Sequence, residues 1–257
     1  MDIKDKVVVI TGAASGIGRG LAERFRAEGA KGLALADIDG DGAAAVAAGL
    51  GDAFAMACDV ADEAQVQALV AETERRFGPI DVFCSNAGIL RLGDEDQPDA
   101  DIEASWRVNA MSHVYAARAV APGMAARGSG YLLNTASAAG ILIQVDSVAY
   151  TMSKHAAIGF AEFLAAKYGP RGVRVSVLCP QGVRTGMTAG RGDKPAFADG
   201  VLEPEDVAEA VVRGMAEERF LILPHEIVET YMRRKADDRD RWLRGMARVR
   251  QSVVPDR

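Results

Sequence analysis

Short runs of consecutive hydrophobic residues alternate along this chain with longer segments in which hydrophobic residues recur at helical spacing. Continuous apolar runs rich in β-branched residues are typical of strands buried on both faces of a parallel sheet. The runs predict six strands, at Val7–Ile10, Gly32–Asp37, Ala53–Cys58, Ile80–Cys84, Gly130–Asn134 and Val173–Leu178. Strands that alternate with helices in this way indicate an α/β fold with a doubly wound parallel sheet flanked by helices.

The predicted helices occupy the intervals between these strands and follow the last one, where apolar residues are spaced three or four apart. They cover residues 21–29, 41–50, 62–78, about 102–126, about 150–169 and about 226–250. Asp62 is a suitable N-cap for its helix, with Gln65 three positions further on.

Two segments are predicted to be loops. Residues 91–101 are acidic, and residues 185–200 are rich in glycine and polar residues, as a mobile lid would be. No linker or internal repeat divides the chain. We therefore expect one domain over residues 1–257, with a core of about 5–224 and a helical C-terminal extension of about 225–251.

The composition is that of a soluble globular protein, with 49% hydrophobic and 26% charged residues among 257. The net charge of -6 lacks the basic excess that nucleic-acid binding needs. No run approaches the roughly 18 apolar residues of a membrane span, and the N-terminal residues lack the layout of a signal peptide. The widely spaced Cys58, Cys84 and Cys179 are typical of core residues in a reducing compartment. We expect a cytoplasmic protein without nucleic-acid or membrane partners.

The three histidines of the sequence are not spaced as metal ligands usually are. His113, His155 and His225 are not paired with one another at a ligand-like interval. The spacing of the three cysteines also does not fit a zinc site. We therefore expect no metal centre.

A glycine-rich turn joins the first predicted strand to the first predicted helix. Gly12, Gly16 and Gly18 have the spacing Gly-x-x-x-Gly-x-Gly. Glycines let the backbone approach a pyrophosphate closely, and the following helix N-terminus offers free N–H groups and a partial positive charge. The segment predicts a phosphate-binding loop, with a turn that binds no ligand as the alternative.

An acidic residue ends the second predicted strand. Asp37 follows Gly18 by nineteen positions, close to the ~20 expected for a carboxylate that binds an adenosine ribose. Neither Ser15 nor the residues after Asp37 supply a cation for a 2′-phosphate, so we expect NAD rather than NADP. The alternative is that Asp37 only caps the next helix.

Tyr150 and Lys154 lie four positions apart on a predicted helix and therefore share one face. A nearby ammonium favours the phenolate, so we expect Lys154 to lower the pKa of Tyr150 and to make it a proton donor and acceptor near neutral pH. The alternative is a half-buried aromatic side chain beside a solvated lysine. Ser137 stands thirteen positions before Tyr150 and follows the fifth strand.

Further chemistry-bearing residues also follow strand ends. Asp59, Asn86 and Pro180 come directly after or close to the third, fourth and sixth strands. Ligands of doubly wound sheets bind beyond the carboxyl ends of the strands. We therefore expect these residues, the glycine turn, Asp37 and Ser137 to gather at one edge.

With these motifs in order, the sequence resembles the compact single-domain branch of the short-chain dehydrogenase/reductase family over roughly residues 5–220. The resemblance is carried by the glycine turn from Thr11 to Gly18, Asp59-Val60, Asn86-Ala-Gly88, Asn109, Ser137, Tyr150-x-x-x-Lys154 and the segment from Pro180 to Thr185. It implies a Rossmann-type fold and an oxidoreductase that acts on a small-molecule alcohol or ketone.

The resemblance also implies a role for each matching residue. Tyr150 would be the general acid/base and Ser137 would bind the substrate oxygen. Lys154 would lower the pKa of Tyr150, and Asn109 would bend its helix and hold a water that links Lys154 to solvent. The residues implied to bind the cofactor are Gly12, Ser15, Gly16, Ile17, Gly18, Asp37, Asp59, Val60, Asn86, Ala87, Gly88, Tyr150, Lys154, Pro180, Gly182, Val183 and Thr185.

The sequence departs from the family pattern in two places. Gln181 stands between Pro180 and Gly182, where the family usually has glycine directly after the proline. Its side chain would project into the substrate or cofactor site. Beyond Phe220–Pro224 the chain continues as a charged helical stretch in place of a Gly-Gly-containing strand. This stretch would pack on its own domain, cover the site or contact another subunit, and we expect a homodimer or homotetramer.

Three functions compete at this point. An NAD-dependent dehydrogenase of secondary alcohols is favoured by Asp37 and by the intact Ser137, Tyr150 and Lys154. An NADPH-dependent biosynthetic ketoreductase and a non-catalytic dinucleotide-binding regulator are the alternatives. The substrate is expected among residues 137–145, with apolar walls from 141–145, residues 181–200 and the C-terminal stretch. Arg184, Arg191 and Lys194 would meet an acidic group of the substrate or remain solvated.

Overall fold

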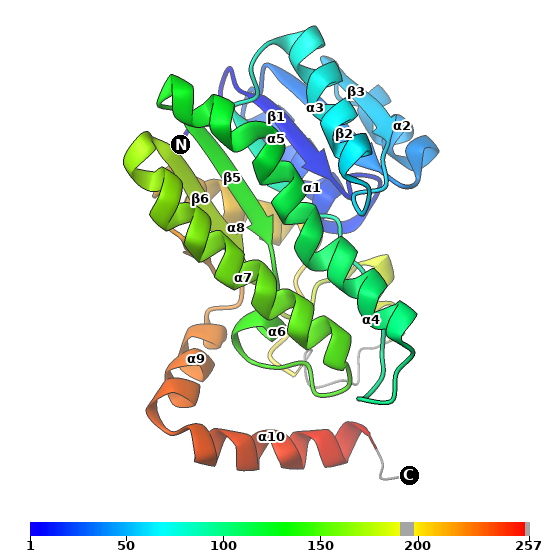
Figure 1. Ribbon diagram of the computed structural model, residues 1–257, viewed down its shortest axis with the longest axis vertical. Helices are drawn as coiled ribbons and strands as arrows, with labels where there is room; N and C mark the ends of the chain where they lie inside the picture. The colour runs from blue at the N-terminus through cyan, green and yellow to red at the C-terminus, as the bar shows by residue number, and fades with distance from the viewer. Residues whose placement is uncertain (191–197, 255–257) are drawn as a thin grey trace.

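The computed structural model describes residues 1–190 and 198–254. Its strands form one parallel sheet in the order β3-β2-β1-β4-β5-β6-β7 (Figure 1). The strands are β1 (Val7–Thr11), β2 (Gly32–Asp37), β3 (Ala53–Ala57), β4 (Val82–Ser85), β5 (Gly130–Thr135), β6 (Val173–Leu178) and β7 (Leu221–Ile222). The predicted doubly wound sheet is confirmed, and the chain order reverses between β1 and β4, which are neighbours in the sheet.

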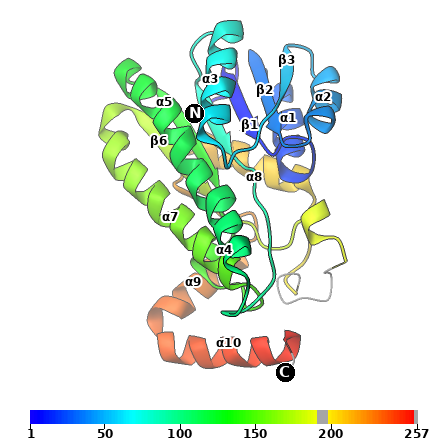
Figure 2. The ribbon, with the colours of Figure 1, turned by 45° about the vertical axis from the view of Figure 1, so that its right-hand side comes forward.

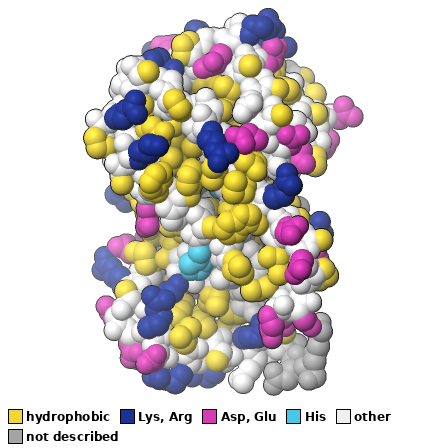
Figure 3. Space-filling view, in the orientation of Figure 1, with side chains coloured by type: hydrophobic (Ala, Val, Ile, Leu, Met, Phe, Trp, Pro, Cys, Tyr) yellow, Lys and Arg dark blue, Asp and Glu magenta, His cyan; other side chains and the backbone are white. Residues whose placement is uncertain are grey.

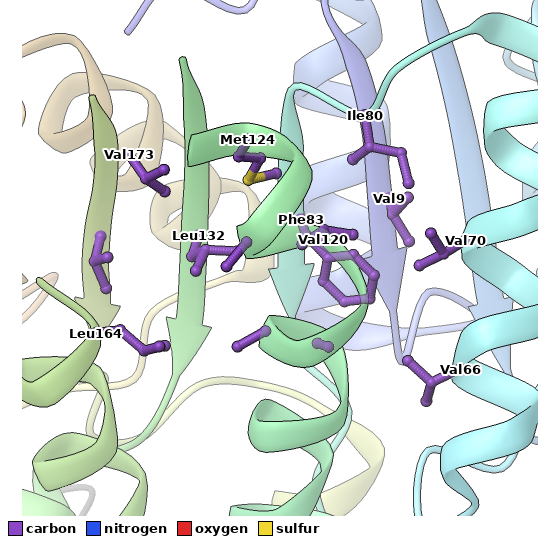
Figure 4. Close-up of a cluster of buried hydrophobic side chains, with 14 of the residues drawn as sticks. Val9, Val66, Val70, Ile80, Phe83, Val120, Met124, Leu132, Leu164 and Val173 are labelled. Carbon is purple, nitrogen blue, oxygen red and sulfur yellow. The ribbon is translucent and has the colours of Figure 1, made fainter. Parts of the chain in front are cut away.

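Helices cover both faces of the sheet. They are α1 (Gly16–Ala27), α2 (Gly40–Ala48), α3 (Glu63–Phe77), α4 (Asp99–Trp106), α5 (Ser112–Arg127), α6 (Ala138–Ile141), α7 (Val148–Tyr168), α8 (Pro204–Ala216), α9 (Ile227–Asp237) and α10 (Arg239–Val253). One hydrophobic cluster joins the sheet to α3, α5 and α7 (Figure 4), and a second joins its other face to α1 and α8.

The continuous apolar run of β1 is explained by these two clusters. Val7 and Val9 belong to the first cluster, whereas Val8 and Ile10 belong to the second. Successive side chains of a strand point to opposite faces, and each face of β1 is covered. Each such buried side chain stabilises the fold by about 1.5–3 kcal/mol. The strand therefore needs no polar positions.

The long helix predicted for about 102–126 begins earlier and is not regular throughout. It starts with α4 at Asp99, passes through one π-helical turn at Arg107–Met111 (η1), and continues as α5 to Arg127. The prediction of a loop over 91–101 is therefore wrong for its last three residues. Pro98 precedes α4, where its fixed φ suits a helix start. The short helix α6, the helix α8 and the short strand β7 were not predicted.

The C-terminal extension consists of two helices, where one continuous stretch was predicted. Asp238 has an extended backbone between α9 and α10, and its carboxylate accepts a hydrogen bond from Arg241 N at 2.9 Å. The break also separates the apolar residues of the extension into two groups. Val228 is buried and Trp242 packs with it in a small cluster with Leu142, whereas the side chain of Leu243 is 51% exposed.

The extension lies at the end of the molecule towards which the strand arrows point (Figures 1 and 2). Lys235 Nζ donates hydrogen bonds to the carbonyls of Ile141 and Leu142. Arg250 donates to Val145 O and forms an ion pair with Asp94 at 2.8 Å. The extension therefore packs on its own domain beside residues 141–145, whereas its contact with another subunit stays a prediction.

Two sequence expectations about the environment bear on the described part of the chain. None of its helices combines the length and the apolar character that crossing a bilayer requires. Cys58, Cys84 and Cys179 are free and buried, as predicted for core residues.

Candidate active site

The glycine turn has the geometry that its sequence predicts. Gly12 and Gly16 have φ of +67° and +54°, a region that side chains disfavour. A Cβ on Gly18 would lie 2.0 Å from Gly12 O, so only glycine lets α1 approach the turn this closely. The N-cap Ser15 makes no side-chain hydrogen bond to α1, and the first turn contains no acid. The N–H groups of this helix end remain suited to an anion.

Asp37 lies at the end of β2 beside this turn. Its Oδ2 accepts a hydrogen bond from Ala14 N at 2.9 Å, and its Oδ1 accepts one from Asp39 N at 3.0 Å. The residue that caps α2 is Asp39, which accepts from Gly42 N. The alternative of Asp37 as only a helix cap is therefore excluded.

A cavity of about 380 Å³ runs along the carboxyl ends of the strands. The predicted residues that line it are Gly12, Ser15, Gly16, Ile17, Asp37, Asp59, Val60, Asn86, Ala87, Gly88, Ser137, Tyr150, Lys154, Pro180, Val183 and Thr185. Gly18 instead packs inside the turn, and Gly182 lines a second, adjoining cavity. A helix N-terminus at one side and the Asp37 carboxylate at the end of the next strand fit the diphosphate and a ribose of a dinucleotide.

Ser137, Tyr150 and Lys154 meet at the inner end of this cavity. Ser137 is the N-cap of α6; its Oγ accepts a hydrogen bond from Ala139 N at 3.1 Å, and it also hydrogen-bonds the Tyr150 side chain. Lys154 Nζ donates to Thr135 O at 3.0 Å and lies 5.6 Å from the centre of the Tyr150 ring. The three side chains come from β5–α6 and one face of α7, as predicted.

The pKa values differ in direction from the sequence expectation. Burial raises the pKa of Tyr150, and the hydrogen bond from Ser137 only partly opposes this effect. Burial also lowers the pKa of Lys154 from 10.5 to about 8. In the chain alone, desolvation is the largest cause of both shifts, and the expected lowering of the Tyr150 pKa is not found.

Asn109 lies in the π-helical turn and is fully buried. Its side chain holds the backbone of Ile89 by two hydrogen bonds of 2.9 Å, and its Nδ2 donates to Ser153 Oγ at 3.2 Å. A Cβ on Gly88 would lie 3.2 Å from Asn109 Oδ1 and 3.4 Å from Lys154 Nζ. Gly88 therefore keeps open the space between the amide and the ammonium. The predicted helix distortion at Asn109 is present.

Two threonines that sequence reasoning missed support the predicted residues. Thr11 Oγ1 accepts hydrogen bonds from Asn86 N and Ala87 N, at 3.0 and 3.1 Å. Thr135 Oγ1 donates to Asn86 Oδ1 at 3.2 Å, and its carbonyl holds Lys154. Both threonines are the last residues of their strands. A polar residue that closes an otherwise apolar run was the available signal.

The second cavity, of about 920 Å³, opens from Ser137 and Tyr150 and extends beneath α9 and α10. Its apolar lining comes from both sides, namely Leu90, Ala138, Ala139, Leu142, Ile143, Val145, Met187, Trp242, Met246, Val249 and Val253. Arg184 is not part of this lining and pairs with Glu203 at 2.7 Å. Arg191 and Lys194 lie outside the described residues.

Side chains that can bind metals do not cluster within residues 1–190 and 198–254. No group of three or more histidine, cysteine, aspartate or glutamate residues in these ranges is placed to hold a metal ion. His113 is buried against Asn134, and His225 accepts a hydrogen bond from the backbone of Gln181.

The chain is similar to known proteins over most of its length. The short chain dehydrogenase family model matches residues 6–196. The 1-deoxy-11-beta-hydroxypentalenate dehydrogenase of Streptomyces exfoliatus is 37% identical over 93% of this chain and 90% of that protein. The D-threitol dehydrogenase of Mycolicibacterium smegmatis is 38% identical over 70% of this chain and 71% of its own length. A crystal structure of a short-chain dehydrogenase/reductase from Burkholderia phymatum in complex with NAD has a TM-score of 0.85 and 31% identity, over 93% of this chain and 96% of that one.

Proposed function

Because the chain belongs to the short-chain dehydrogenase family and is an oxidoreductase, we propose that it interconverts a secondary alcohol and a ketone with NAD. The observation that carries this proposal is the meeting of two cavities at Ser137 and Tyr150. One cavity suits a dinucleotide and the other an apolar organic molecule. A hydroxyl in the second cavity would reach the Tyr150 phenol from the side opposite the glycine turn.

The proposed roles follow from the contacts of each side chain. Ser137, which hydrogen-bonds the Tyr150 side chain, would bind the substrate oxygen. In oxidation Tyr150 would accept the hydroxyl proton, and in reduction it would return the proton. Lys154, held by Thr135 O, would place a positive charge beside the phenol. The bound nicotinamide would accept or supply the hydride.

Asn109 has a positioning role in this proposal. Its amide fixes the backbone at Ile89, and its Oδ1 faces the space beside Lys154 that Gly88 leaves open. A water bonded there would connect the ammonium to solvent, so that the proton taken by Tyr150 can leave the site.

The preference for NAD rests on the end of β2. Asp37 presents a carboxylate to the cavity, and the next residue, Ile38, is apolar and 77% exposed. A 2′-phosphate would be repelled by the carboxylate and would find no cation there. The NADPH-dependent ketoreductase is therefore the second candidate, and it would require the opposite preference.

The substrate we propose is a secondary alcohol with a bulky, largely apolar body. The second cavity is several times larger than a small alcohol needs, and about half of its lining residues are aliphatic or aromatic. Charged side chains, among them Arg234, Asp237 and Arg241, complete the lining on the side of α9 and α10. Relatives with 37–38% identity are named as dehydrogenases of a hydroxypentalenate and of D-threitol, which are both alcohols.

The deciding experiment is a screen of secondary alcohols with NAD and with NADP, followed by the absorbance of the reduced nicotinamide. We expect turnover of bulky apolar alcohols with NAD. Binding of NADH without turnover of any alcohol or ketone would favour the non-catalytic regulator. A better kcat/KM with NADP would favour the ketoreductase.

We also propose that the protein is a cytoplasmic homo-oligomer. Hydrophobic side chains gather on the face that α5 and α7 cover (Figure 3). Phe163 and Met152 of α7 are 57% and 51% exposed, which is costly for large apolar groups without a partner. A second copy of the chain is the proposed partner. Light scattering after size exclusion tests it, and a monomer at micromolar concentration would contradict it.

A further inference from the structure

Gln181 lies where the two cavities meet and lines both of them. It follows Pro180, whose carbonyl accepts hydrogen bonds from Ser137 Oγ at 3.5 Å and from Ala138 N at 2.9 Å. Consecutive Cα atoms are about 3.8 Å apart. The Gln181 side chain therefore starts within one residue of the backbone that contacts the proposed substrate-binding hydroxyl.

The orientation of the Gln181 amide is fixed by a carboxylate. Nε2 donates a hydrogen bond to Asp199 Oδ2 at 3.2 Å. Only the NH₂ end of the amide can donate to a carboxylate, so Oε1 must point away from Asp199. Among the described residues, Oε1 is a buried acceptor without a hydrogen-bond partner. Native proteins rarely leave such an atom unpaired, because its desolvation is not compensated.

Both ends of Gln181 are anchored by the C-terminal part of the chain. The Gln181 N–H donates to His225 Nδ1 at 3.2 Å, which places the imidazole proton of the neutral ring on Nε2. The Tyr231 hydroxyl donates to the second oxygen of Asp199 at 2.9 Å. Asp199, His225 and Tyr231 all lie beyond residue 196, where the family-model match ends. The acceptor is therefore held in place by a segment that the family model does not include.

We propose that Gln181 Oε1 accepts a hydrogen bond from a second hydroxyl of the substrate, and that the enzyme selects diols over alcohols with a single hydroxyl. This inference rests on the proposed function, because it assumes that the first hydroxyl reacts at Ser137 and Tyr150. We take the second hydroxyl to be on the carbon next to the reacting one or one carbon further. The carbon skeleton then lies against the apolar walls under α10.

The test compares matched pairs of substrates that differ by one hydroxyl. Suitable pairs are cyclohexanol and cyclohexane-1,2-diol, 2-decalol and decalin-2,3-diol, and 2-octanol and octane-2,3-diol, each assayed by NADH formation. A site that hydrogen-bonds a hydroxyl rejects the analogue that lacks it. We expect kcat/KM of the native enzyme to favour the diol by at least about 10-fold in the pairs that are turned over.

Gln181→Met removes the acceptor and keeps the side-chain length, whereas Gln181→Gly restores the residue that the family resemblance predicts. Both variants should reduce the ratio of kcat/KM for the diol to kcat/KM for the mono-alcohol by about 10-fold or more, mainly through KM. Tyr231→Phe, which loosens Asp199, should reduce it less. The matched control is Gln67→Met, because Gln67 is an exposed glutamine on α3 and lines neither cavity. The control should keep the ratio of the native enzyme.

The possible outcomes distinguish a failure of this inference from a failure of the proposed function. Equal kcat/KM for mono-alcohols and diols, or a ratio that survives Gln181→Met, overturns the inference and leaves the proposed function intact. No turnover of any pair by the native enzyme overturns both. Gln181→Met could instead raise the dissociation constant for NADH and leave the ratio of kcat/KM for diol to mono-alcohol unchanged. That result would assign Oε1 to the nicotinamide amide and would also overturn the inference.

Discussion

The buried ammonium of Lys154 should make the free enzyme less stable than a variant without it. Lys154 is 3% exposed, and its pKa falls from 10.5 to about 8. Each pKa unit corresponds to 1.36 kcal/mol. The charge therefore costs the folded state about 3 kcal/mol at neutral pH, where both the folded and the unfolded chain carry the proton.

Lys154→Met removes this charge and keeps the side-chain volume. It also removes the hydrogen bond to Thr135 O, which costs about 1 kcal/mol. At pH 7 the variant should gain about 2 kcal/mol in the free energy of unfolding. As the pH rises from 8 to 10.5, native Lys154 loses its proton while the unfolded chain keeps it. The cost then disappears, and near pH 10.5 the variant should be the less stable protein by about 1 kcal/mol.

Urea unfolding of both proteins without dinucleotide, at pH 7 and pH 10.5, measures this reversal. Lys167→Met is the matched control, because Lys167 is exposed on the same helix and should change stability by less than about 0.5 kcal/mol at both pH values. A variant that is less stable than the native enzyme at pH 7 would refute the reasoning. The reasoning would also be refuted if the difference in free energy of unfolding between the two proteins were the same at pH 7 and pH 10.5. Turnover with alcohol should fall in Lys154→Met, so that stability and activity move in opposite directions.

Three further predictions concern the proposed reaction. Tyr150→Phe keeps the ring but removes the phenol, so turnover should fall at least about 100-fold while NADH fluorescence still reports binding; normal turnover would exclude Tyr150 as the acid/base. Asp37→Ala should narrow the ratio of kcat/KM with NAD to that with NADP by about 10-fold, and a native enzyme that already prefers NADP would contradict the assignment. Removal of residues 238–257 deletes α10 with Trp242 and should raise KM for bulky alcohols at least about fivefold without altering NADH affinity. Unchanged KM values would show that α10 is not a wall of the substrate site.

The strands and the cofactor edge were predictable because their signals are local. Runs such as Val7–Ile10 are apolar without interruption only where both faces are covered, and their ends fix where the ligand edge lies. The predicted strand limits agree with the structure to within two residues, the largest difference being at β4, which begins at Val82. Each glycine and acid of the cofactor site then follows a strand end in the sequence.

The C-terminal helices were less predictable because nothing in the local sequence marks their division. The segment from Ala236 to Arg241 contains neither glycine nor proline. Asp238 ends α9 and caps α10, but an aspartate in a charged helical stretch is also common on an exposed helix face. After the break, Trp242 packs against a cluster that contains Leu142, a residue 100 positions earlier in the chain.

The pKa directions at the site were also beyond reach of the sequence. The spacing of Tyr150 and Lys154 indicates that the two side chains share a face, but it contains no information on how deeply both are buried. Desolvation depends on the residues that close the site from distant parts of the chain. For the same reason Gln181 could be recognised as unusual, while its partners Asp199 and His225 could not be identified.

The contacts that hold α9 and α10 have a consequence for how this enzyme can diverge. Three of them run from Lys235 or Arg250 to the backbone carbonyls of Ile141, Leu142 and Val145. Backbone carbonyls are present whatever the side chains are, so mutation of residues 141–145 need not disturb the attachment. A C-terminal segment from a relative that supplies cations at the positions of Lys235 and Arg250 would attach to the same carbonyls, carry over a new wall and keep the old reaction. Recombination at the 3′ end of the coding sequence is thus a short evolutionary route, and a practical one in the laboratory, to a dehydrogenase with a different substrate.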